Sequence, residues 1–386
     1  MDANRISKPK LLILSPVTRA DLEGPLENFR KFEIWHLYHK ALKDIPLDRM
    51  NTRSFRFRNL LDAFIKTMRI RPSVIQGSEP YYLPWGFILS ALTMLAAKLL
   101  DVPYYFPMFE NVPPEIKFNI RKAGIPAGWF LIPFLKNFAT HYAKGASLIF
   151  ALNESAKQNL LNLGVSKSKI VKRLYGTWGV DTRKFCHARN GTEPDFGDNA
   201  ILFVGRIVPA KGIRYLLEAF LKVRKIIPTT RLIFIGDGSM IPEIKKFILE
   251  NSLQSTVSFL GVINNRGLPP YIRASRIVAA PSLTTPTWME QVGMVNIQSI
   301  SCGTPVVTTN SGSIPEFIED GVTGIIVPER NSAALVRAII RLLTDSELYQ
   351  RLSRNGRQAA EQKYDATRNI AEVEQIILSR VLHQTM

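Results

Sequence analysis

Short apolar segments alternate with amphipathic segments along most of the chain, most regularly in its second half. The strands expected there are 201–204, 231–235, 257–260, 277–280, 305–309 and 324–327, with helices at 214–225 and 240–251 among those between them. In the first half, the expected strands are 11–14, 74–76, 104–107 and 147–152, with helices at 59–67 and 155–162. Strands that alternate with helices in this way predict parallel sheets covered by helices on both faces.

One segment interrupts this pattern and predicts a domain boundary. Residues 183–199 are polar, contain Gly and Pro, and show no periodicity, so they are expected to form a linker. The chain then divides into a Rossmann-like domain at 1–182, a second at 200–365, and a C-terminal helix at 366–386 that is expected to pack back on the first domain. Ligands of open α/β sheets bind beyond the carboxyl ends of the strands.

Composition narrows the class of protein. The 386 residues have an apolar fraction of 46% and carry 50 Lys and Arg against 32 Asp and Glu, a net charge of +18. This excess predicts an anionic partner such as a nucleotide, a nucleic acid or an acidic lipid, although a solvated basic surface is the alternative. Cys186 and Cys302 form no CxxC pair, and no histidine spacing is typical of a metal site.

Targeting and membrane signals are weak. The N-terminus lacks the long apolar stretch of a signal peptide. The longest apolar stretch, 81–100, is interrupted by Pro84 and Lys98 and is short for a membrane span, so we interpret it as a helix buried between layers. With the reduced cysteines, these features predict a cytoplasmic protein.

Two cations lie on one loop at the expected carboxyl edge of the second sheet. The segment VGRIVPAKG ends a strand at Gly205 and carries Arg206 and Lys211 before the next helix. Fixed positive charges there would stabilise the charge that a departing nucleoside diphosphate gains as its bond to a sugar breaks. Arg can contact two phosphate oxygens, and Lys supplies a point charge. The alternative is an ordinary basic loop.

A second loop combines an acid, exposed backbone and an amide. Glu290 would accept hydrogen bonds from sugar hydroxyls, and Gln298, eight positions later, would reach ribose hydroxyls. Between them, the N–H groups of Gly293, Met294 and Val295 would meet a phosphate at a helix N-terminus. The alternative is a surface helix with chance polar residues, which fits poorly with the neighbouring glycines.

A third turn, Gly236-Asp237-Gly238, follows another expected strand. Gly236 permits close approach of backbone, and Asp237 caps the next helix or serves the turn. The chain contains no GxGxxG dinucleotide fingerprint and no DxD metal signature.

These motifs occur in an order that resembles the retaining glycosyltransferases of family 4, which have the GT-B fold. The matching pieces are VGRIVPAKG, IGDGS, FLG, AAPS, EQVGMVNIQ and CGTPVVTTNSGSIPEFIEDGVTGIIV, covering about residues 200–340. The resemblance implies two Rossmann-like domains facing across a cleft, with the acceptor on residues 1–182 and the nucleotide-sugar donor on 200–365.

The resemblance also implies residue roles. Arg206 and Lys211 would hold the donor diphosphate, and Glu290 would contact the transferred sugar. Val262 and Ile263 would flank the nucleobase. Gln298 stands where the family has a second glutamate, which removes charge-assisted strength of roughly 1–2 kcal/mol per bond.

The N-terminal half resembles the family more loosely. Gln76 and Ser78 stand where histidines often precede the Glu-Pro pair, and Glu110 and Asn111 occupy the region of a catalytic-site histidine. The first loop has Gly24 alone where the family has paired glycines. The candidate acceptor-side residues are therefore Gly24, Glu79, Glu110 and Asn111.

The expected activity is transfer of a sugar, a hexose or a related unit, from a nucleoside diphosphate to a hydroxyl with retained anomeric configuration. The leaving diphosphate can take the acceptor proton, so no protein nucleophile is required. Arg206 and Lys211 would replace a divalent cation. We expect no metal and no cofactor beyond the nucleotide-sugar donor.

The acceptor is expected to be a glycan or a lipid-linked molecule, in polysaccharide biosynthesis on the inner face of a membrane. The segment 117–144 is apolar with cationic edges, which is typical either of an interfacial helix on an anionic bilayer or of a core helix with a basic outer face. Further cations in this half are Arg53, Arg56, Arg58, Lys66, Arg69 and Arg71. No nucleic-acid motif is present.

Two other functions remain open at this point. A non-catalytic GT-B accessory protein or sugar-nucleotide sensor would account for Gln298 and for the absent N-terminal histidine. A nucleotide-sugar 2-epimerase would share the fold, although the motif around Glu290 favours transfer.

Overall fold

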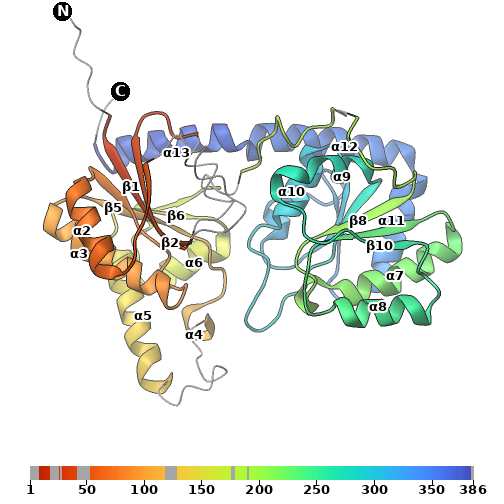
Figure 1. Cartoon of the computed structure of the whole chain (residues 1–386), viewed down its shortest axis with the longest axis horizontal. Helices are drawn as coiled ribbons and strands as arrows, with labels where there is room; N and C mark the ends of the chain where they lie inside the picture. Colours follow the sequence, from red (N-terminus) through yellow and green to blue (C-terminus); the bar gives the residue numbers. More distant parts are fainter. Residues whose placement is uncertain are drawn as a thin grey trace, which may run out of the picture. The chain divides into compact units, whose positions relative to one another are not determined.

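The computed structural model describes residues 8–17, 26, 28–40, 53–117, 128–174, 179–188 and 191–383 (Figure 1). The chain forms two compact units. Unit 1 consists of Met1–Gly179 and Ala366–Met386, and unit 2 of Val180–Asp365. The division therefore falls at residues 179–180 and 365–366, and the expected linker 183–199 lies within unit 2. Two contacts hold this segment on unit 2: Phe185 is buried, and Glu193 forms a buried ion pair with Arg273.

Unit 1 is built on a parallel sheet whose described strands have the order β3-β2-β1-β4-β5-β6-β7. The strands are β1 (Lys10–Val17), β2 (Glu33–Lys40), β3 (Arg53–Arg56), β4 (Val74–Gln76), β5 (Tyr104–Met108), β6 (Leu148–Ala151) and β7 (Ile170–Lys172). The helices are α2 (Leu60–Ile70), α3 (Trp85–Leu100), α4 (Pro114–Lys117), α5 (Gly128–Gly145), α6 (Glu154–Asn162), the short η3 (Lys167–Lys169) and α13 (Ala366–Arg380). Sequence reasoning missed β2, β3 and β7, because His36 and charged ends interrupt the apolar run of β2 and the other two are short.

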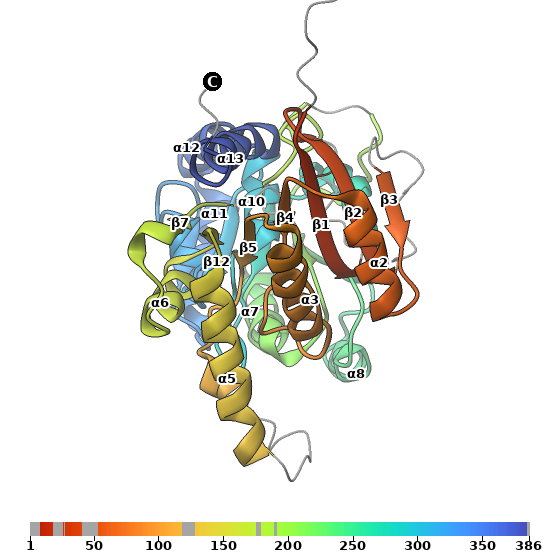
Figure 2. The ribbon, with the colours of Figure 1, turned by 90° about the vertical axis from the view of Figure 1, so that its left-hand side faces the viewer.

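Alternation along β1 sends its side chains into two different cores. Leu12 and Leu14 join the core formed with α2, α3, α5 and α6, while Leu11 and Ile13 join the core formed with α13. Figures 1 and 2 show α13 on the other side of this sheet from α2, α3 and α5. Glu374 fastens α13 further, because its carboxylate accepts hydrogen bonds from the N–H groups of Arg30 (2.8 Å) and Lys31 (2.7 Å). The C-terminal helix is thus an integral layer of unit 1.

Helix α3 differs from the expectation of a helix buried between layers. It packs on β1 and β4 with residues such as Leu89 and Ala96, but Leu95 and Leu99 are about half exposed. The reason is that the sheet covers only one face of α3. Helix α5 likewise buries Leu135 and Tyr142 in the core and exposes Phe134 on its outer side.

Unit 2 is built on a parallel sheet whose described strands have the order β10-β9-β8-β11-β12-β13. The strands are β8 (Ala200–Val204), β9 (Arg231–Ile235), β10 (Val257–Phe259), β11 (Ile277–Ala280), β12 (Val306–Thr309) and β13 (Ile325–Val327). The helices are α7 (Ile213–Ile226), α8 (Ile241–Glu250), α9 (Pro269–Ala274), α10 (Met294–Ser301), α11 (Ser332–Thr344) and α12 (Ser346–Ala359). Shorter helical turns are η5 (Pro209–Lys211), η6 (Asn265–Gly267), η7 (Ile314–Glu316) and η8 (Ala360–Tyr364).

Both faces of the second sheet are covered. Helices α7, α8 and α11 share a core with Ile201, Phe203 and Phe234, while α9 and α10 contact the sheet at β8, β11 and β12. Side chains cap several helices: Asn331 accepts from the N–H of Ala334 at the start of α11, and Asp345 accepts from that of Leu348 at the start of α12. This covered sheet is a rigid support for the loops at its carboxyl edge.

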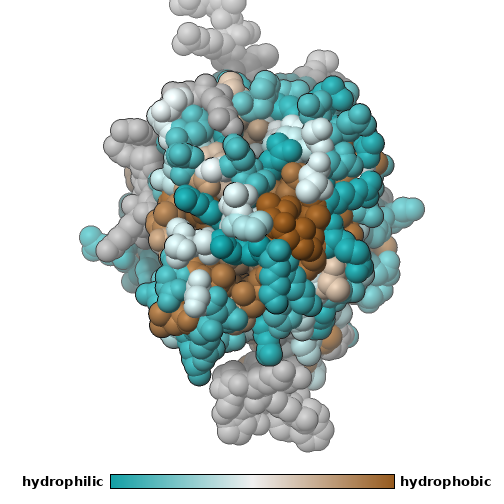
Figure 3. Space-filling view, turned by 90° about the vertical axis from the view of Figure 1, so that its right-hand side faces the viewer, coloured by the Kyte–Doolittle hydropathy of each residue, from teal (hydrophilic) through white to brown (hydrophobic). Residues whose placement is uncertain are grey.

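The two units differ in their exposed apolar residues. Of the large hydrophobic side chains that are exposed in the described chain, ten lie in unit 1 and five in unit 2. The face drawn in Figure 3 is mostly hydrophilic, with one larger hydrophobic patch near its centre and smaller hydrophobic areas elsewhere. None of the helices described is long and apolar enough to cross a membrane. The exposed apolar side chains of the described chain are thus concentrated on unit 1.

Candidate functional site

The candidate residues of unit 2 come from loops at one edge of its sheet. Gly205 follows β8, Gly236 follows β9, Val262 and Ile263 follow β10, and Glu290 and Gly293 lie between β11 and α10. Because all these strands are parallel, their carboxyl ends meet at the same edge. The structure thus gathers the predicted donor-side positions of unit 2 on neighbouring loops.

Gly205 and Gly236 pack backbone against backbone. Gly236 has φ of 140°, and a Cβ at this position would lie 1.9 Å from the carbonyl oxygen of Gly205. The N–H of Gly205 donates to Ile235 (3.0 Å), and that of Gly236 donates to Gly261 (2.8 Å). Only glycine fits this contact at position 236. The result is a surface of bare backbone where β8, β9 and β10 end.

Lys211 is held by a similar contact between the loops after β8 and β11. It ends η5, and Gly212 follows with φ of 68°. A Cβ at Gly212 would lie 1.8 Å from the carbonyl oxygen of Pro281, so only glycine fits there. The N–H of Leu283 donates to the carbonyl of Ala210 (2.8 Å). These two contacts fix the position of Lys211 relative to the segment that leads to Glu290.

Lys211 and Glu290 form an ion pair, and both side chains are largely buried. The hydroxyl of Ser282 donates to the same carboxylate oxygen, Oε1, at 2.7 Å. The Lys211 Nζ also lies 4.8 Å from the centroid of the Trp288 ring, within the range of a cation–π interaction. The partly desolvated ammonium group of Lys211 is therefore held beside the carboxylate of Glu290, between the loops after β8 and β11.

The backbone around Glu290 is fixed as well. Its carbonyl accepts a hydrogen bond from the N–H of Ser313 (2.9 Å), and a Cβ on Gly312 would lie 2.2 Å from that carbonyl oxygen. The hydroxyl of Thr284 lies 3.2 Å from that of Ser311 and donates to Glu329 at 2.6 Å. The loops after β12 and β13 thus hold the loop that carries Glu290.

Arg206 is placed differently from Lys211. It is exposed, and within the described part of the chain its side chain has no hydrogen bond or ion pair. The structure therefore joins Lys211 to Glu290 directly but leaves Arg206 as a free cation on the same loop.

Helix α10 begins at Gly293, which has φ of 74°. The N–H groups of Met294 and Val295 lie in its first turn, where no earlier carbonyl of the helix can accept their hydrogen bonds. Further along, the buried Gln298 donates from Nε2 to Oδ1 of Asn265 (2.6 Å), on the loop after β10. Val262, on the same loop, is 71% exposed, which leaves its surface open to a flat ligand.

Sequence reasoning missed four contributors to this site: Ser282, Trp288, Asn265 and Thr284. Ser282 lies in the AAPS motif but was not singled out, and the spacing of Trp288, two residues before Glu290, was a usable signal. Asn265 and Thr284 carry no local signal, because their roles depend on contacts with residues 33 and 45 positions away.

In unit 1, Gln76 and Ser78 stand where the family that the sequence resembles often has histidines, and both residues are hydrogen-bonded within the fold. Gln76 is buried, and its Oε1 accepts from the hydroxyl of Tyr105 (3.2 Å). Ser78 donates to the carbonyl of Leu14 (3.0 Å), and its own carbonyl accepts from the hydroxyl of Tyr142 (3.1 Å). These groups support the loop after β4.

Glu79 and Glu110 lie together after β4 and β5. The N–H of Glu110 donates to Glu79 Oε1 (2.7 Å), and Lys117 pairs with Glu110 at 2.5 Å. Burial and the neighbouring Glu110 raise the pKa of Glu79 to about 8, so this carboxyl is protonated near neutrality. Asn111 is buried beside Glu110. Gly24 lies outside the described residues.

Another buried titratable group of unit 1 is His36, which sequence reasoning did not single out. Its Nε2 lies 2.7 Å from the Ser15 hydroxyl at the end of β1, and its Nδ1 lies 3.3 Å from that of Ser54. Burial lowers the pKa of His36 to about 3, so the ring is neutral at pH 7. In the ranges that the structure describes, no group of three His, Cys, Asp or Glu side chains is arranged to hold a metal ion.

Residues 187–359 match the family model of glycosyl transferases group 1. This region contains all the loops of unit 2 described above. Among curated proteins, the chain is 30% identical over 164 residues to alpha-D-kanosaminyltransferase of Streptomyces kanamyceticus, a match that covers 42% of this chain and 41% of that protein. It is 26% identical to a GDP-mannose-dependent phosphatidylinositol monomannoside mannosyltransferase of Mycolicibacterium smegmatis, over 58% of this chain and 59% of that one. The chain spans about half the length of the curated relatives it matches.

Solved structures establish the fold. The structure of HepE from Anabaena in complex with UDP and glucose superposes with a TM-score of 0.74 over 96% of this chain and all of that chain, at 16% identity. The sucrose-phosphate synthase of Thermosynechococcus elongatus gives a TM-score of 0.69 over 97% of this chain and all of that one, also at 16% identity. The chain has the GT-B fold, with two Rossmann-like units, as predicted.

Proposed function

We propose that this chain is a glycosyltransferase that moves a sugar from a nucleoside diphosphate sugar to a hydroxyl acceptor with retained anomeric configuration. The observation that carries the proposal is the pairing of Lys211 with Glu290 beside the exposed Arg206, within the segment that matches the group 1 model. The named relatives are sugar transferases, and HepE was solved with UDP and glucose.

The donor would bind with its diphosphate over the backbone of Gly205 and Gly236. Neither residue has a side chain in the way, and Arg206 can turn its free guanidinium onto two phosphate oxygens. The first N–H groups of α10, at Met294 and Val295, add partial positive charge from the other side. We place the nucleobase beside Val262 and Ile263, and the ribose near Gln298.

Lys211 would act on the charge that develops in the reaction. The bond between the anomeric carbon and the diphosphate oxygen breaks, and the acceptor oxygen forms its bond to the same face of the sugar. The acceptor proton passes to the departing diphosphate, so no protein group needs to take it. Lys211 stabilises the leaving group, and Glu290 accepts hydrogen bonds from the sugar hydroxyls. We infer that these cations make a divalent metal unnecessary.

Unit 1 would receive the acceptor, and we propose that it lies against an anionic membrane. Exposed apolar side chains gather on β3, α2 and α3: Phe55, Leu60, Leu61, Ile65, Leu95 and Leu99. Cations on the same elements include Arg53, Arg56, Lys66 and Lys98. Apolar residues rimmed by cations are typical of proteins that bind anionic lipid surfaces.

Flotation of the protein with vesicles tests whether unit 1 binds an anionic membrane. We compare vesicles of phosphatidylcholine alone with vesicles that also contain phosphatidylglycerol. Equal recovery of the protein with both kinds of vesicle would exclude charge-dependent binding.

Substitution of the two cations is the main test. Arg206→Ala and Lys211→Ala should each lower turnover by about tenfold or more, because each removes a charge that stabilises the leaving diphosphate. Arg214→Ala is the matched control, since Arg214 is exposed on α7 of the same unit and pairs only with Glu218 among the described residues. Unchanged kinetics in both test variants would overturn the role of the diphosphate site.

The donor is identified separately, by thermal unfolding with UDP, GDP, ADP and their sugar conjugates. A ligand at a hundred times its dissociation constant stabilises the folded state by about 2.7 kcal/mol. Activity in the presence of EDTA tests whether a metal is needed.

A second candidate function is a GT-B protein that binds a sugar nucleotide without transferring the sugar. It is favoured by Gln76 and Ser78, which stand at histidine positions of the resembled family and are hydrogen-bonded within unit 1. This candidate predicts stabilisation by a sugar nucleotide with neither transfer nor hydrolysis of it. Detection of a transfer product by NMR excludes it.

A further inference from the structure

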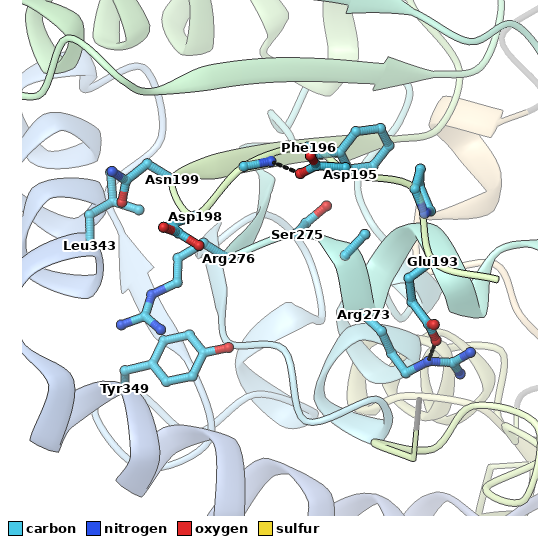
Figure 4. Close-up of a pocket in the computed structure, with 13 residues that line it drawn as sticks. Glu193, Asp195, Phe196, Asp198, Asn199, Arg273, Ser275, Arg276, Leu343 and Tyr349 are labelled. Atoms are coloured by element: carbon cyan, nitrogen blue, oxygen red, sulfur yellow. Dashed lines mark hydrogen bonds and ion pairs between the residues drawn. The ribbon is translucent and has the colours of Figure 1, made fainter. Parts of the chain in front are cut away.

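A second concave site lies at the opposite edge of the sheet in unit 2. It is a cavity of about 600 Å³ between the segment 193–199, the end of α9, and residues of α11 and α12 (Figure 4). Asn199 directly precedes β8 and Arg276 directly precedes β11, so this cavity is at the amino edge of the sheet. We call it the amino-edge pocket. Its volume is within the range of about 300–1,000 Å³ of small-molecule sites.

One wall of the pocket is a fixed ion pair. Arg273 and Glu193 meet at 2.7 Å, and both side chains are more than nine-tenths buried. Arg273 also donates to the carbonyl of Cys186 (3.3 Å), and Glu193 accepts from the N–H of Gly191 (3.0 Å). The charges of Arg273 and Glu193 compensate each other, so this pair is a rigid part of the wall and does not determine which ligand fits.

On the other side of the pocket, the guanidinium of Arg276 has no hydrogen-bond acceptor among the described residues. Figure 4 shows Arg276, Tyr349 and Asp198 together there. The Arg276 guanidinium stacks on the Tyr349 ring at 3.6 Å from its centroid. Among the residues that the structure describes, no group accepts a hydrogen bond from this guanidinium. Stacking fixes the guanidinium plane and leaves its N–H edge for a ligand.

Acceptors lie within the same pocket. Asp198 is exposed and has no partner in the described chain, and Asp195 uses Oδ1 to accept from the N–H of Gly197 (2.9 Å). Phe196, which lies between Asp195 and Asp198 in the sequence, also lines the pocket and adds an aromatic ring to it. The pocket therefore offers open carboxylate acceptors, a fixed donor fork and aromatic surface.

Charge selects the ligand class. Apart from the Arg273–Glu193 pair, the acidic and basic side chains that line the pocket are Asp195, Asp198 and Arg276. A phosphate or carboxylate ligand would be repelled by Asp195 and Asp198, and a polyamine by Arg276. A neutral ligand with several hydroxyls satisfies both kinds of group, because each hydroxyl donates to a carboxylate and accepts from the guanidinium.

We propose that the amino-edge pocket is a carbohydrate-binding site that takes a neutral hexose or N-acetylhexosamine unit. It is separate from the loops that carry Lys211 and Glu290, which lie at the carboxyl edge. The proposal does not depend on transfer activity, since the pocket would bind sugar whether or not the chain transfers one.

The test is a titration of the full chain with glucose, mannose, galactose and N-acetylglucosamine. The readout is methyl NMR of Leu343, which lines the pocket, with sugars added to about 50 mM so that dissociation constants near 1 mM are measured. We expect at least one sugar to shift the Leu343 signal, and Lys211→Ala to leave this binding unchanged. No shift with any of the four sugars overturns the proposal, as does a shift with inorganic phosphate or spermidine alone.

Two variants assign the binding to the pocket. Arg276→Ala and Asp198→Asn should each weaken the sugar at least fivefold, and Arg214→Ala should not. Asp198→Asn is the safer variant, because Asp198 has no contact that supports the fold, whereas Arg276→Ala also removes the stack on Tyr349. Sugar affinity that is unchanged in Asp198→Asn and in a folded Arg276→Ala protein would show that the sugar binds elsewhere.

Discussion

The two units differ in the contacts that hold polar groups at the edge of the sheet. In unit 2, backbone packs on backbone: Gly236 touches Gly205, Gly212 touches Pro281, and Gly312 touches Glu290. In unit 1, side chains hold one another, as when Tyr105 bonds to Gln76 and Ser78 bonds to Leu14. In unit 2, the guanidinium of Arg206 and the first N–H groups of α10 remain available to a ligand, whereas the polar groups named in unit 1 bond to one another.

This difference explains why sequence signals were strong in one unit and weak in the other. A glycine that no other residue can replace is recognisable in the sequence, and unit 2 has several such glycines. A side-chain network can be built from many residue combinations, so it leaves no short motif.

The largest effect is expected for Gly212→Ala, compared with Gly321→Ala. Both glycines have nearly the same backbone, with φ of 68° and 71°, but a Cβ on Gly212 would lie 1.8 Å from Pro281 O, while one on Gly321 would meet nothing within 4 Å. We expect Gly212→Ala to cost about 3 kcal/mol or more, and Gly321→Ala about 1 kcal/mol. Urea unfolding measures both. Equal costs would mean that close backbone packing does not hold the loops of unit 2.

A smaller effect, on activity alone, is expected for Glu290→Gln. The amide keeps an acceptor for Ser282 but loses the charge that faces Lys211 and the sugar hydroxyls. Turnover should fall about 10–100-fold, equivalent to about 1.4–2.7 kcal/mol. Glu243→Gln, an exposed acid on α8, serves as the control. A variant that loses its thermal stability but keeps its turnover would make Glu290 a support for the loop.

The sequence predicted the fold and the place of the glycine-containing loops at the carboxyl edge of unit 2, because both depend on local patterns. Alternating apolar runs identified every strand of unit 2, and the glycines with cations identified Arg206 and Lys211 on one loop. It missed β2, since His36 and the Lys and Glu at its ends disguise a strand that pairs with two neighbours.

Contacts between distant residues were beyond the sequence. The Lys211–Glu290 pair joins residues 79 positions apart, and the amino-edge pocket combines Glu193 and Arg276 with Tyr349. Only the folded chain brings such groups together. The same holds for the segment 183–199, which lies within unit 2 and is tied there by the pair of Glu193 with Arg273, 80 positions later.

Gln298 gives a smaller and sharper test within unit 2. Its Nε2 bonds to Asn265 Oδ1, and the Asn265 amide can rotate to present its NH₂ group to a carboxylate. Gln298→Glu should therefore be tolerated, and its charge should strengthen a bond to ribose by about 1 kcal/mol, or about fivefold in donor KM. Gln298→Ala should raise that KM instead. A higher KM in Gln298→Glu would place the ribose away from this side chain.

The smallest expected effect is on the pH dependence of stability, and it comes from titratable groups of unit 1. Its shifted groups include Glu79, with pKa raised to about 8 by burial and Glu110, and Glu374, with pKa raised by burial. In unit 2, burial raises the pKa of Cys302 and of Tyr364 to about 12, outside the range of pH 5–8. Between these pH values, the comparison predicts that the pH dependence of stability comes mainly from unit 1.

The sign for Glu79 follows from proton binding. Between pH 4.5 and about 8 the folded state keeps a proton that the unfolded chain releases, so raising the pH through this range destabilises the folded state. Glu79→Gln cannot ionise and keeps the acceptor for the N–H of Glu110. Its melting temperature should therefore fall less than that of the wild type from pH 5 to pH 8, by a few °C. Burial lowers the pKa of His36 to about 3, which acts in the opposite direction, because the unfolded chain gains a proton below pH 6.5 and the folded one does not. Parallel curves for the wild type and Glu79→Gln between pH 5 and 8 would mean that Glu79 is ionised in the folded protein, and that a carboxylate is available on this loop to contact an acceptor.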